Sequence, residues 1–168
     1  METIEQEKPQ TNISQRVAIL VDGNNIGMSI HDKTKNPNAM LNFKTFVPKV
    51  LKGRGLNRLY YFREGKSISA KLGKLLHDEF FGVVVPCGKS ADVHLTITAT
   101  EIADKVDTVI ILSGDSDYLP LVKHLQSRGV RVEIACLALS ASAELVLASD
   151  YHYEITETDF YFFLPKKA

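Results

Sequence analysis

The sequence predicts an α/β protein: a three-layer α/β/α sandwich around a central, mainly parallel sheet of five to six strands. Two features of the chain predict this fold. Short apolar runs, rich in β-branched residues and typical of strands buried on both faces, alternate with segments of helical spacing. The helical segments are long enough to act as right-handed crossovers, which place successive strands parallel in one sheet.

The first half of the chain contains three strands and two helices by this pattern. Val17–Val21 is a continuous β-branched run and is therefore predicted to be a buried strand. A polar loop is expected at Asp32–Ala39, and Asn42–Lys52 has helical apolar spacing that Gly53 and Gly55 end. The other elements are a strand at Leu56–Phe62, a helix at Ser67–Phe80 with Ser67 as its N-cap, and a strand at Val83–Pro86.

The second half of the chain repeats the alternation. Apolar residues at Val93, Ile97 and Ile102 give Ala91–Lys105 a helical period, and Thr108–Leu112 is the most apolar strand. The remaining elements are a helix at Tyr118–Arg128 that Gly129 ends, a strand at Val130–Cys136, a short helix at Ala141–Ala148 and a strand at Tyr153–Ile155.

Composition limits the class of protein. The chain has 168 residues, 45% apolar and 24% charged, with a net charge of zero. That length supports one domain that buries about 70% of its unfolded surface, which we place at residues 15–168 behind a flexible tail at 1–14. No apolar run reaches about 18 residues, and the N-terminus lacks the features of a signal peptide. We therefore expect a cytoplasmic protein, not associated with a membrane, in which Cys87 and Cys136 are reduced thiols.

Four aspartates stand where the predicted strands end. Asp22 follows the first strand, Asp115 and Asp117 follow the fourth, and Asp92 lies in the first turn of the helix after the third. The carboxyl ends of parallel strands meet at one edge of a sheet. Four like charges there raise one another's pKa, and a hard divalent cation such as Mg²⁺ relieves that conflict. The set therefore predicts a metal site.

Each acid also has a simpler interpretation on its own. Asp22 is suited to cap a following turn, and Asp117 to cap the helix at Tyr118. Asp92 has the favourable position of an acid in the first turn of a helix. Only their joint placement at matching strand ends favours the metal site.

Several motifs together resemble one known family. They are Val21-Asp-Gly-Asn-Asn25, Lys89-x-x-Asp92-Val93, the run SGDSDYLPLV from Ser113, the run GVRVEIA from Gly129, and Ser142-x-x-Leu145 followed by Asp150-Tyr151. They resemble the NYN domain family, the LabA-like branch of the PIN-like nucleases, over about Arg16 to Ile155. The resemblance implies a PIN-like Rossmannoid fold and a Mg²⁺- or Mn²⁺-dependent ribonuclease that hydrolyses phosphodiester bonds in single-stranded or flexible RNA.

The resemblance carries over residue by residue. Asp22, Asp92, Asp115 and Asp117 match the family's catalytic and metal-binding acids, and Asn24, Ser113 and Lys89 match its supporting positions. It implies that Asp22 is the central ligand, that Asp92 binds directly or through water, and that Asp115 or Asp117 holds or deprotonates the attacking water. Thr98 stands where many members carry a further acid, so one cation rather than two is expected.

A basic segment offers a surface for RNA. Nine Lys or Arg residues and one acid, Glu64, lie between Lys44 and His77. Arg63, Lys66 and Lys71 follow the second strand most closely and are the predicted RNA-binding residues; the alternative is a solvated helix face. Tyr60–Phe62 either supply a stacking surface or, as we favour, fill the core.

Two other functions remain open from the sequence. One is a catalytically inactive module that binds RNA or protein, which Thr98 favours. The other is a phosphatase with Asp22 as nucleophile, for which Asn24 stands where an acid is expected. The apolar run Phe160–Leu164 either docks on the edge of its own sheet or is buried against a second subunit in a homodimer. Zero net charge leaves room for a protein partner that supplies targeting.

Overall fold

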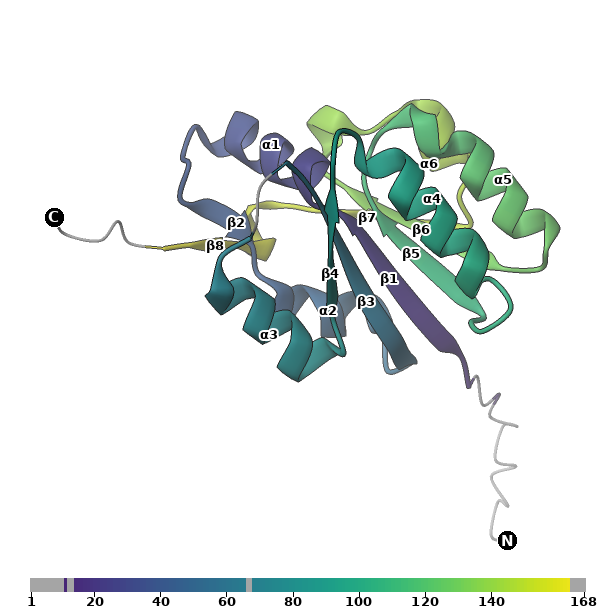
Figure 1. Ribbon diagram of the computed structural model, residues 1–168. Helices are drawn as coiled ribbons and strands as arrows, with labels where there is room; N and C mark the ends of the chain where they lie inside the picture. The colour runs from purple at the N-terminus through teal and green to yellow at the C-terminus, as the bar shows by residue number, and fades with distance from the viewer. Residues whose placement is uncertain (1–10, 12–13, 66–67, 164–168) are drawn as a thin grey trace, which may run out of the picture.

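A six-stranded parallel sheet forms the centre of the protein. The computed structural model describes residues 11, 14–65 and 68–163. The strand order is β4-β3-β1-β5-β6-β7, and each neighbouring pair is parallel (Figure 1). The strands are β1 (Arg16–Asp22), β3 (Gly55–Glu64), β4 (Val83–Cys87), β5 (Thr108–Leu112), β6 (Arg131–Cys136) and β7 (Tyr151–Glu154). The predicted α/β fold with a mainly parallel central sheet is confirmed.

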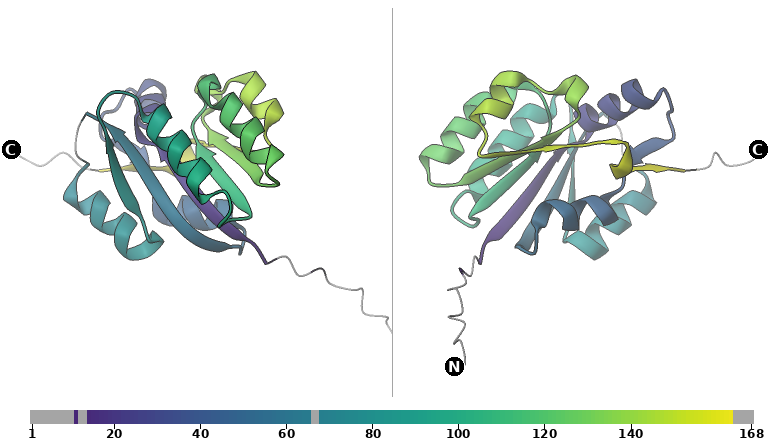
Figure 2. Two further views of the ribbon diagram at one scale, coloured as in Figure 1. Left: turned by 45° about the vertical axis from the view of Figure 1, so that its right-hand side comes forward. Right: turned by 180° about the vertical axis from the view of Figure 1, so that it is seen from behind.

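Helices cover both faces of this sheet (Figure 2). One layer consists of α1 (Gly23–Thr34), α2 (Phe43–Leu51) and α3 (Ala70–Phe80), and the other of α4 (Ala91–Ile102), α5 (Leu119–Ser127) and α6 (Ala143–Ala148). Each layer packs on its own hydrophobic cluster. Side chains alternate along β1, so Ile19 and Val21 enter the first cluster and Leu20 the second. By the same alternation, Asp22 lies on the side of α4 and α5.

The predicted loop at Asp32–Ala39 is wrong in part, because α1 occupies Gly23–Thr34. Asp22 caps this helix: its Oδ1 accepts the backbone N–H of Asn25 at 3.1 Å. Ile26 and Ile30, four residues apart, bury one face of the helix in the core. The cap and these two side chains stabilise a segment whose glycines and asparagines have poor intrinsic helix propensity.

The C-terminal apolar run pairs with a strand that the sequence did not predict. β8 (Phe160–Phe162) is antiparallel to β2 (Ala39–Leu41) in a separate two-stranded sheet. The run therefore does not dock on the edge of the central sheet. Phe160 is buried, whereas Tyr161 and Phe162 are about half exposed, and Leu164 lies outside the described residues. Burial of this run against a second subunit stays a prediction.

The other predicted helices and strands are present with small changes at their ends. Ser67, the predicted cap of α3, lies outside the described residues, and Ser69 caps that helix by accepting the N–H of Leu72 at 3.2 Å. Tyr61 and Phe62 are buried, as the core interpretation predicts. Within the described part of the chain, no helix is long and apolar enough to cross a membrane.

Candidate metal centre

Three of the predicted acids meet at the carboxyl edge of the sheet. One carboxylate oxygen from each of Asp92, Asp115 and Asp117 lies within 4.8 Å of the other two. Asp92 and Asp115 are half-buried and Asp117 is exposed, so the group is open to solvent on one side. The pairing of β1 with β5, with Val21 opposite Leu112, brings the end of β1 beside the loop that carries Asp115 and Asp117.

The loop after β5 aims its two acids by local hydrogen bonds. The Ser113 hydroxyl oxygen accepts the N–H of Asp115 at 3.2 Å, and Asp115 Oδ1 accepts the N–H of Asp117 at 2.9 Å. The second contact caps a short 3₁₀ turn, η1 (Ser116–Tyr118). The predicted helix at Tyr118–Arg128 therefore begins as this turn before α5. Ser113 thus acts on the backbone of the acidic loop.

Two further contacts hold this loop against its neighbours. The N–H of Gly114 donates to the side-chain oxygen of Asn25 at 3.2 Å, which ties the loop to the start of α1. A Cβ at position 114 would collide with the carbonyl of Ser140, so only glycine fits. The acidic loop is therefore fixed from two sides.

Asp92 is positioned by the start of α4. The Ser90 hydroxyl accepts the N–H of Asp92 at 3.2 Å and caps the helix. The N–H of Ala91 donates to Glu64 Oε1 at 2.9 Å, and the N–H of Glu64 donates to Asn24 Oδ1 at 2.8 Å. Glu64, a residue that sequence reasoning counted only as a charge, thus joins the ends of β3 and β1 to α4.

Asp22 lies outside the close group and reaches it through Tyr118. Asp22 is only 4% exposed, and Tyr118 is fully buried. The Tyr118 hydroxyl donates to Asp22 Oδ2 at 2.9 Å and lies 3.4 Å from Asp92 Oδ1. Sequence reasoning missed Tyr118, because nothing in the local sequence shows that this ring turns inward beneath the acids.

The environment shifts three pKa values upward. Burial raises the pKa of Asp22, although hydrogen bonds from the Asn25 N–H and Tyr118 partly oppose the shift. The negative charge of Asp115, and then that of Asp92, raises the pKa of Asp117. Burial and the charge of Asp22 raise the pKa of Tyr118, so its hydroxyl stays protonated and donates. The site carries an excess of negative charge that a cation relieves.

The residues present fit a hard divalent cation. The close group offers only carboxylate oxygens, the donors that Mg²⁺ and Mn²⁺ prefer over nitrogen or sulfur. Its open side leaves room for water and for a phosphate oxygen. Asn24 does not provide the general acid that the phosphatase interpretation needs, since it is an amide whose oxygen accepts the N–H of Glu64.

A hollow of about 440 Å³ lies beside the hydrogen bonds that join Asn24, Glu64 and the start of α4. Its lining residues come from the start of α1, the end of β3 and the loop before α4: Asn24, Arg63, Glu64, Gly65, Gly88 and Lys89. Lys89 is exposed at its rim. Two cationic side chains, from Arg63 and Lys89, therefore line the hollow between the start of α1 and the loop before α4.

The rest of the basic segment is largely engaged elsewhere. Lys66 lies outside the described residues, and Lys71 is exposed on the first turn of α3. Four other cations pair with acids of the fold: Lys44 with Glu79, Lys49 with Asp159, Lys74 with Asp78, and Arg54 with Glu133. Lys52 lies over the ring of Tyr151. Among the described residues that were predicted to bind RNA, Arg63 lines the hollow and Lys71 does not.

The metal centre predicts a pH-dependent stabilisation by Mn²⁺. At about 100 times its dissociation constant, Mn²⁺ is expected to add about 2.7 kcal/mol, which raises the melting temperature by roughly 5–10 °C. Because the pKa of Asp117 is raised, protons compete at this site at a higher pH than at an ordinary aspartate. The Mn²⁺-induced rise should therefore shrink as the pH is lowered from about 7 towards about 4.5.

Thermal melts with and without Mn²⁺ at several pH values measure this. Asp32→Asn, on the exposed side of α1, is the matched control and should retain the full effect. An equal Mn²⁺-induced rise in Asp117→Asn and in the wild type would contradict the assignment of Asp117 to the site.

The fold and the site together define the class of protein. It is a three-layer α/β protein with an acidic, all-oxygen group at the carboxyl edge of a parallel sheet. The model of the NYN domain family matches residues 16–156, and the chain belongs to that family. Members of this family have a PIN-like nuclease fold and are generally nucleases.

Comparison with solved structures supports the same fold. The chain is similar to a protein of unknown function from Vibrio parahaemolyticus, with a TM-score of 0.76 and 22% sequence identity. The similarity covers 91% of this chain and 100% of that one. No curated protein matches this chain.

Proposed function

We propose that this protein is a metal-dependent ribonuclease that hydrolyses phosphodiester bonds of single-stranded or flexible RNA. One observation carries the proposal: in a chain of the NYN family, Asp92, Asp115 and Asp117 bring carboxylate oxygens within 4.8 Å of one another. A protein that only binds RNA gains nothing from clustered acids facing a polyanion. Assignment to the LabA-like branch and a cytoplasmic location belong to this proposal too.

The environment of each acid determines its role in the proposed reaction. Asp92, Asp115 and Asp117 hold one Mg²⁺ or Mn²⁺, which when bound supplies positive charge that offsets the charge developing on the phosphodiester. Asp117 is the exposed member of the group, on its open side, and is therefore placed to accept the proton of the attacking water. Oδ1 of Asp115 accepts the N–H of Asp117, so its other carboxylate oxygen, Oδ2, is the one that would bind the cation.

The residues around the acids position them and the substrate. The family resemblance implied that Asp22 is the central ligand, but Asp22 is not among the three acids whose oxygens lie within 4.8 Å of one another. Its role in this proposal is to act through Tyr118, whose hydroxyl lies between Asp22 and Asp92. Lys89 and Arg63 line the adjoining hollow and contact phosphate oxygens of the RNA strand. Phosphate contacts of this kind give affinity without sequence preference and weaken as salt rises.

Cleavage of a labelled single-stranded RNA tests the proposal. Wild-type protein with Mn²⁺ or Mg²⁺ should cleave it, and EDTA should stop the cleavage. Folded protein that neither cleaves RNA nor binds Mn²⁺ in calorimetry would overturn the proposal. Binding of RNA without cleavage under these conditions would instead support the inactive module, which Thr98 on α4 favours.

Removing the Tyr118 hydroxyl should weaken the site without removing an acid. Tyr118→Phe leaves the buried Oδ2 of Asp22 without its donor, which costs about 1–3 kcal/mol of stability. Loss of such a positioning partner typically lowers metal affinity about 10- to 100-fold. Calorimetric titration with Mn²⁺ measures the affinity, and Tyr151→Phe, an exposed tyrosine on β7, is the control. Unchanged Mn²⁺ affinity in Tyr118→Phe would show that the hydroxyl is only structural.

A further inference from the structure

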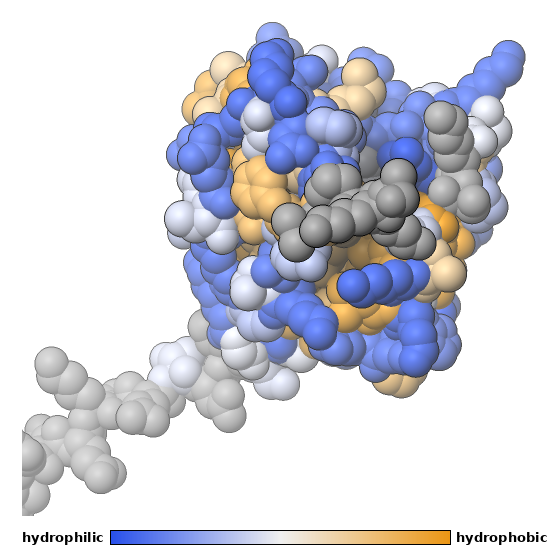
Figure 3. Space-filling model, turned by 90° about the vertical axis from the view of Figure 1, so that its left-hand side faces the viewer, coloured by the Kyte–Doolittle hydropathy of each residue, from blue (hydrophilic) through white to orange (hydrophobic). Residues whose placement is uncertain are grey.

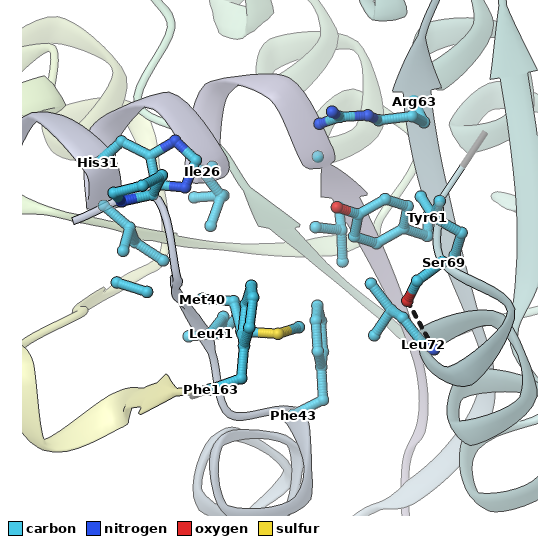
Figure 4. A pocket seen from close by; sticks show the side chains of 17 residues that line it. Ile26, His31, Met40, Leu41, Phe43, Tyr61, Arg63, Ser69, Leu72 and Phe163 are labelled. Atoms are coloured by element: carbon cyan, nitrogen blue, oxygen red, sulfur yellow. Dashed lines mark hydrogen bonds between the residues drawn. The ribbon is translucent and has the colours of Figure 1, made fainter. Parts of the chain in front are cut away.

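A second cavity lies on the opposite face of the sheet from the acids. It encloses about 260 Å³ between α1, β2 and the first turns of α2 and α3. Its walls are mainly apolar and aromatic, and Figure 4 shows Ile26, Met40, Phe43, Tyr61 and Leu72 around it. In Figure 3, apolar side chains are visible on this side of the molecule in two patches, each bordered by hydrophilic ones.

Arg63 lies between this cavity and the hollow at the start of α1. It lines both spaces, and Figure 4 shows it extending from β3 across the upper side of the cavity. Its Nε is buried, and no hydrogen-bond partner for it lies among the residues that the structure describes. A buried donor without an acceptor is costly, so a ligand that brings an acceptor gains from this atom.

The end of β1 and the start of α1 also border both spaces. Val21 and Gly23 line the cavity, Asn24 lines the hollow, and Asp22 between them belongs to the acidic site. The segment from Val21 to Asn24 therefore runs along the cavity, the acidic site and the hollow in turn.

The cavity has the size and chemistry for a flat ring that carries acceptors. Pockets for drug-sized ligands usually measure about 300–1,000 Å³, so this one suits a single ring system rather than a whole cofactor. Phe43 and Tyr61 meet edge to face, with centroids 6.1 Å apart, and offer aromatic surface. The Arg63 guanidinium and the hydroxyls of Tyr61 and Ser69, which also line the cavity, can donate hydrogen bonds to a ligand.

We propose that this cavity binds one nucleobase of the RNA strand, with the carbonyl or ring-nitrogen acceptors of the base directed at Arg63. The inference rests on the proposed ribonuclease function and adds a base-binding subsite to it. An aliphatic side chain of a protein partner would also fill the apolar walls. It would leave the Arg63 donor unsatisfied, and the nucleobase is therefore the occupant that fits best.

Gly27 provides a sharp test of the cavity. It lines the cavity in the middle of α1, and a Cβ placed there meets nothing within 4 Å. Because Gly27 lines the cavity, the ring of Gly27→Phe is expected to occupy part of it, whereas the methyl group of Gly27→Ala leaves it nearly unchanged. Glycine is a poor helix residue, so both variants are expected to fold. The alanine variant is the matched control for the change in the helix.

Binding of mononucleotides, measured by calorimetry and NMR in the absence of metal, separates base from phosphate. Guanosine 5′-monophosphate or uridine 5′-monophosphate should bind at least tenfold more tightly than ribose 5-phosphate. Gly27→Phe should remove this advantage, and Gly27→Ala should retain it. Equal binding of ribose 5-phosphate and both nucleotides overturns the inference, and so does a Gly27→Phe variant that keeps wild-type affinity for them.

The base-binding cavity and the ribonuclease activity can be refuted independently, because the nucleotide-binding experiment needs neither metal nor cleavage. Nucleotide binding that Gly27→Phe abolishes, in a protein that never cleaves RNA, supports the base-binding cavity and counts against the nuclease. Conversely, RNA cleavage by Gly27→Phe with wild-type kcat and KM supports the nuclease and overturns the subsite.

Discussion

Asp115→Asn is expected to reduce RNA cleavage by about 10³-fold or more. The change removes one charge and one ligand from the close group while keeping the shape of the side chain. The amide oxygen of the variant still accepts the N–H of Asp117, so the 3₁₀ turn η1 should persist. In the absence of metal the variant should be at least as stable as the wild type, because the repulsion between Asp115 and Asp117 is relieved.

Two measurements on the same protein decide the outcome. Single-turnover cleavage of a labelled RNA gives the rate, and thermal melting without metal gives the stability. Asp32→Asn, an exposed acid of α1, is the matched control and should cleave at the wild-type rate. If Asp115→Asn cleaves as fast as this control, Asp115 has no part in the reaction.

The largest loss of stability is expected from Arg54→Met. The Arg54 guanidinium donates to both oxygens of Glu133, at 2.9 and 2.8 Å, and to the carbonyls of Leu51 and Val50. Glu133 is only 2% exposed and also accepts from Arg131 and Tyr153. Breaking a buried pair leaves a buried charge, and Arg131, which is about half exposed, compensates it only in part, so the expected cost is about 3 kcal/mol.

Thermal melting measures the loss of stability in Arg54→Met. The substitution should lower the melting temperature by roughly 6–12 °C. Arg128→Met removes an exposed pair with Asp104 and should cost less than about 1 kcal/mol. Equal losses in the two variants would mean that the buried network has no special weight.

The same network sets a dependence on pH. Burial acts to raise the pKa of Glu133, but hydrogen bonds from Arg54 and Arg131 outweigh it and hold this pKa below its ordinary value. A lowered carboxyl pKa contributes stability above the ordinary value, and this contribution is lost as the pH falls through the folded-state value. Wild-type protein should therefore lose more stability on acidification below about pH 4.5 than Arg54→Met does.

The buried strands could be predicted from the sequence because their signal is local. Runs such as Thr108–Leu112, buried at every position, have no other stable environment in a chain of this size. The helix α1 could not be predicted in this way: its stability comes from the Asp22 cap and from packing of Ile26 and Ile30 on the sheet. Likewise, β2 and β8 have three residues each, and their pairing joins segments far apart in the chain.

In the candidate site, too, some residues could be predicted from the sequence and others could not. Asp92, Asp115 and Asp117 could be placed together from topology, since strand ends meet at one edge of a parallel sheet. The contribution of Tyr118 could not, because a 3₁₀ turn directs its ring inward and no periodicity shows that direction. Glu64 was hidden for a different reason: its role is to accept an N–H at the start of α4, which only the folded chain creates.

The central position of β1 has a consequence for the protein during its synthesis. β1 lies between β3 and β5, and Tyr118 contacts Asp22 across 96 residues of chain. At about 5–20 residues per second, a ribosome needs about 5–20 s to make that intervening stretch. Until then, Asp22 and Asp92 have emerged without Asp115 or Asp117, and the acidic group is incomplete. Under the proposed function, a nascent chain cannot cleave RNA before this part of the chain has emerged and folded.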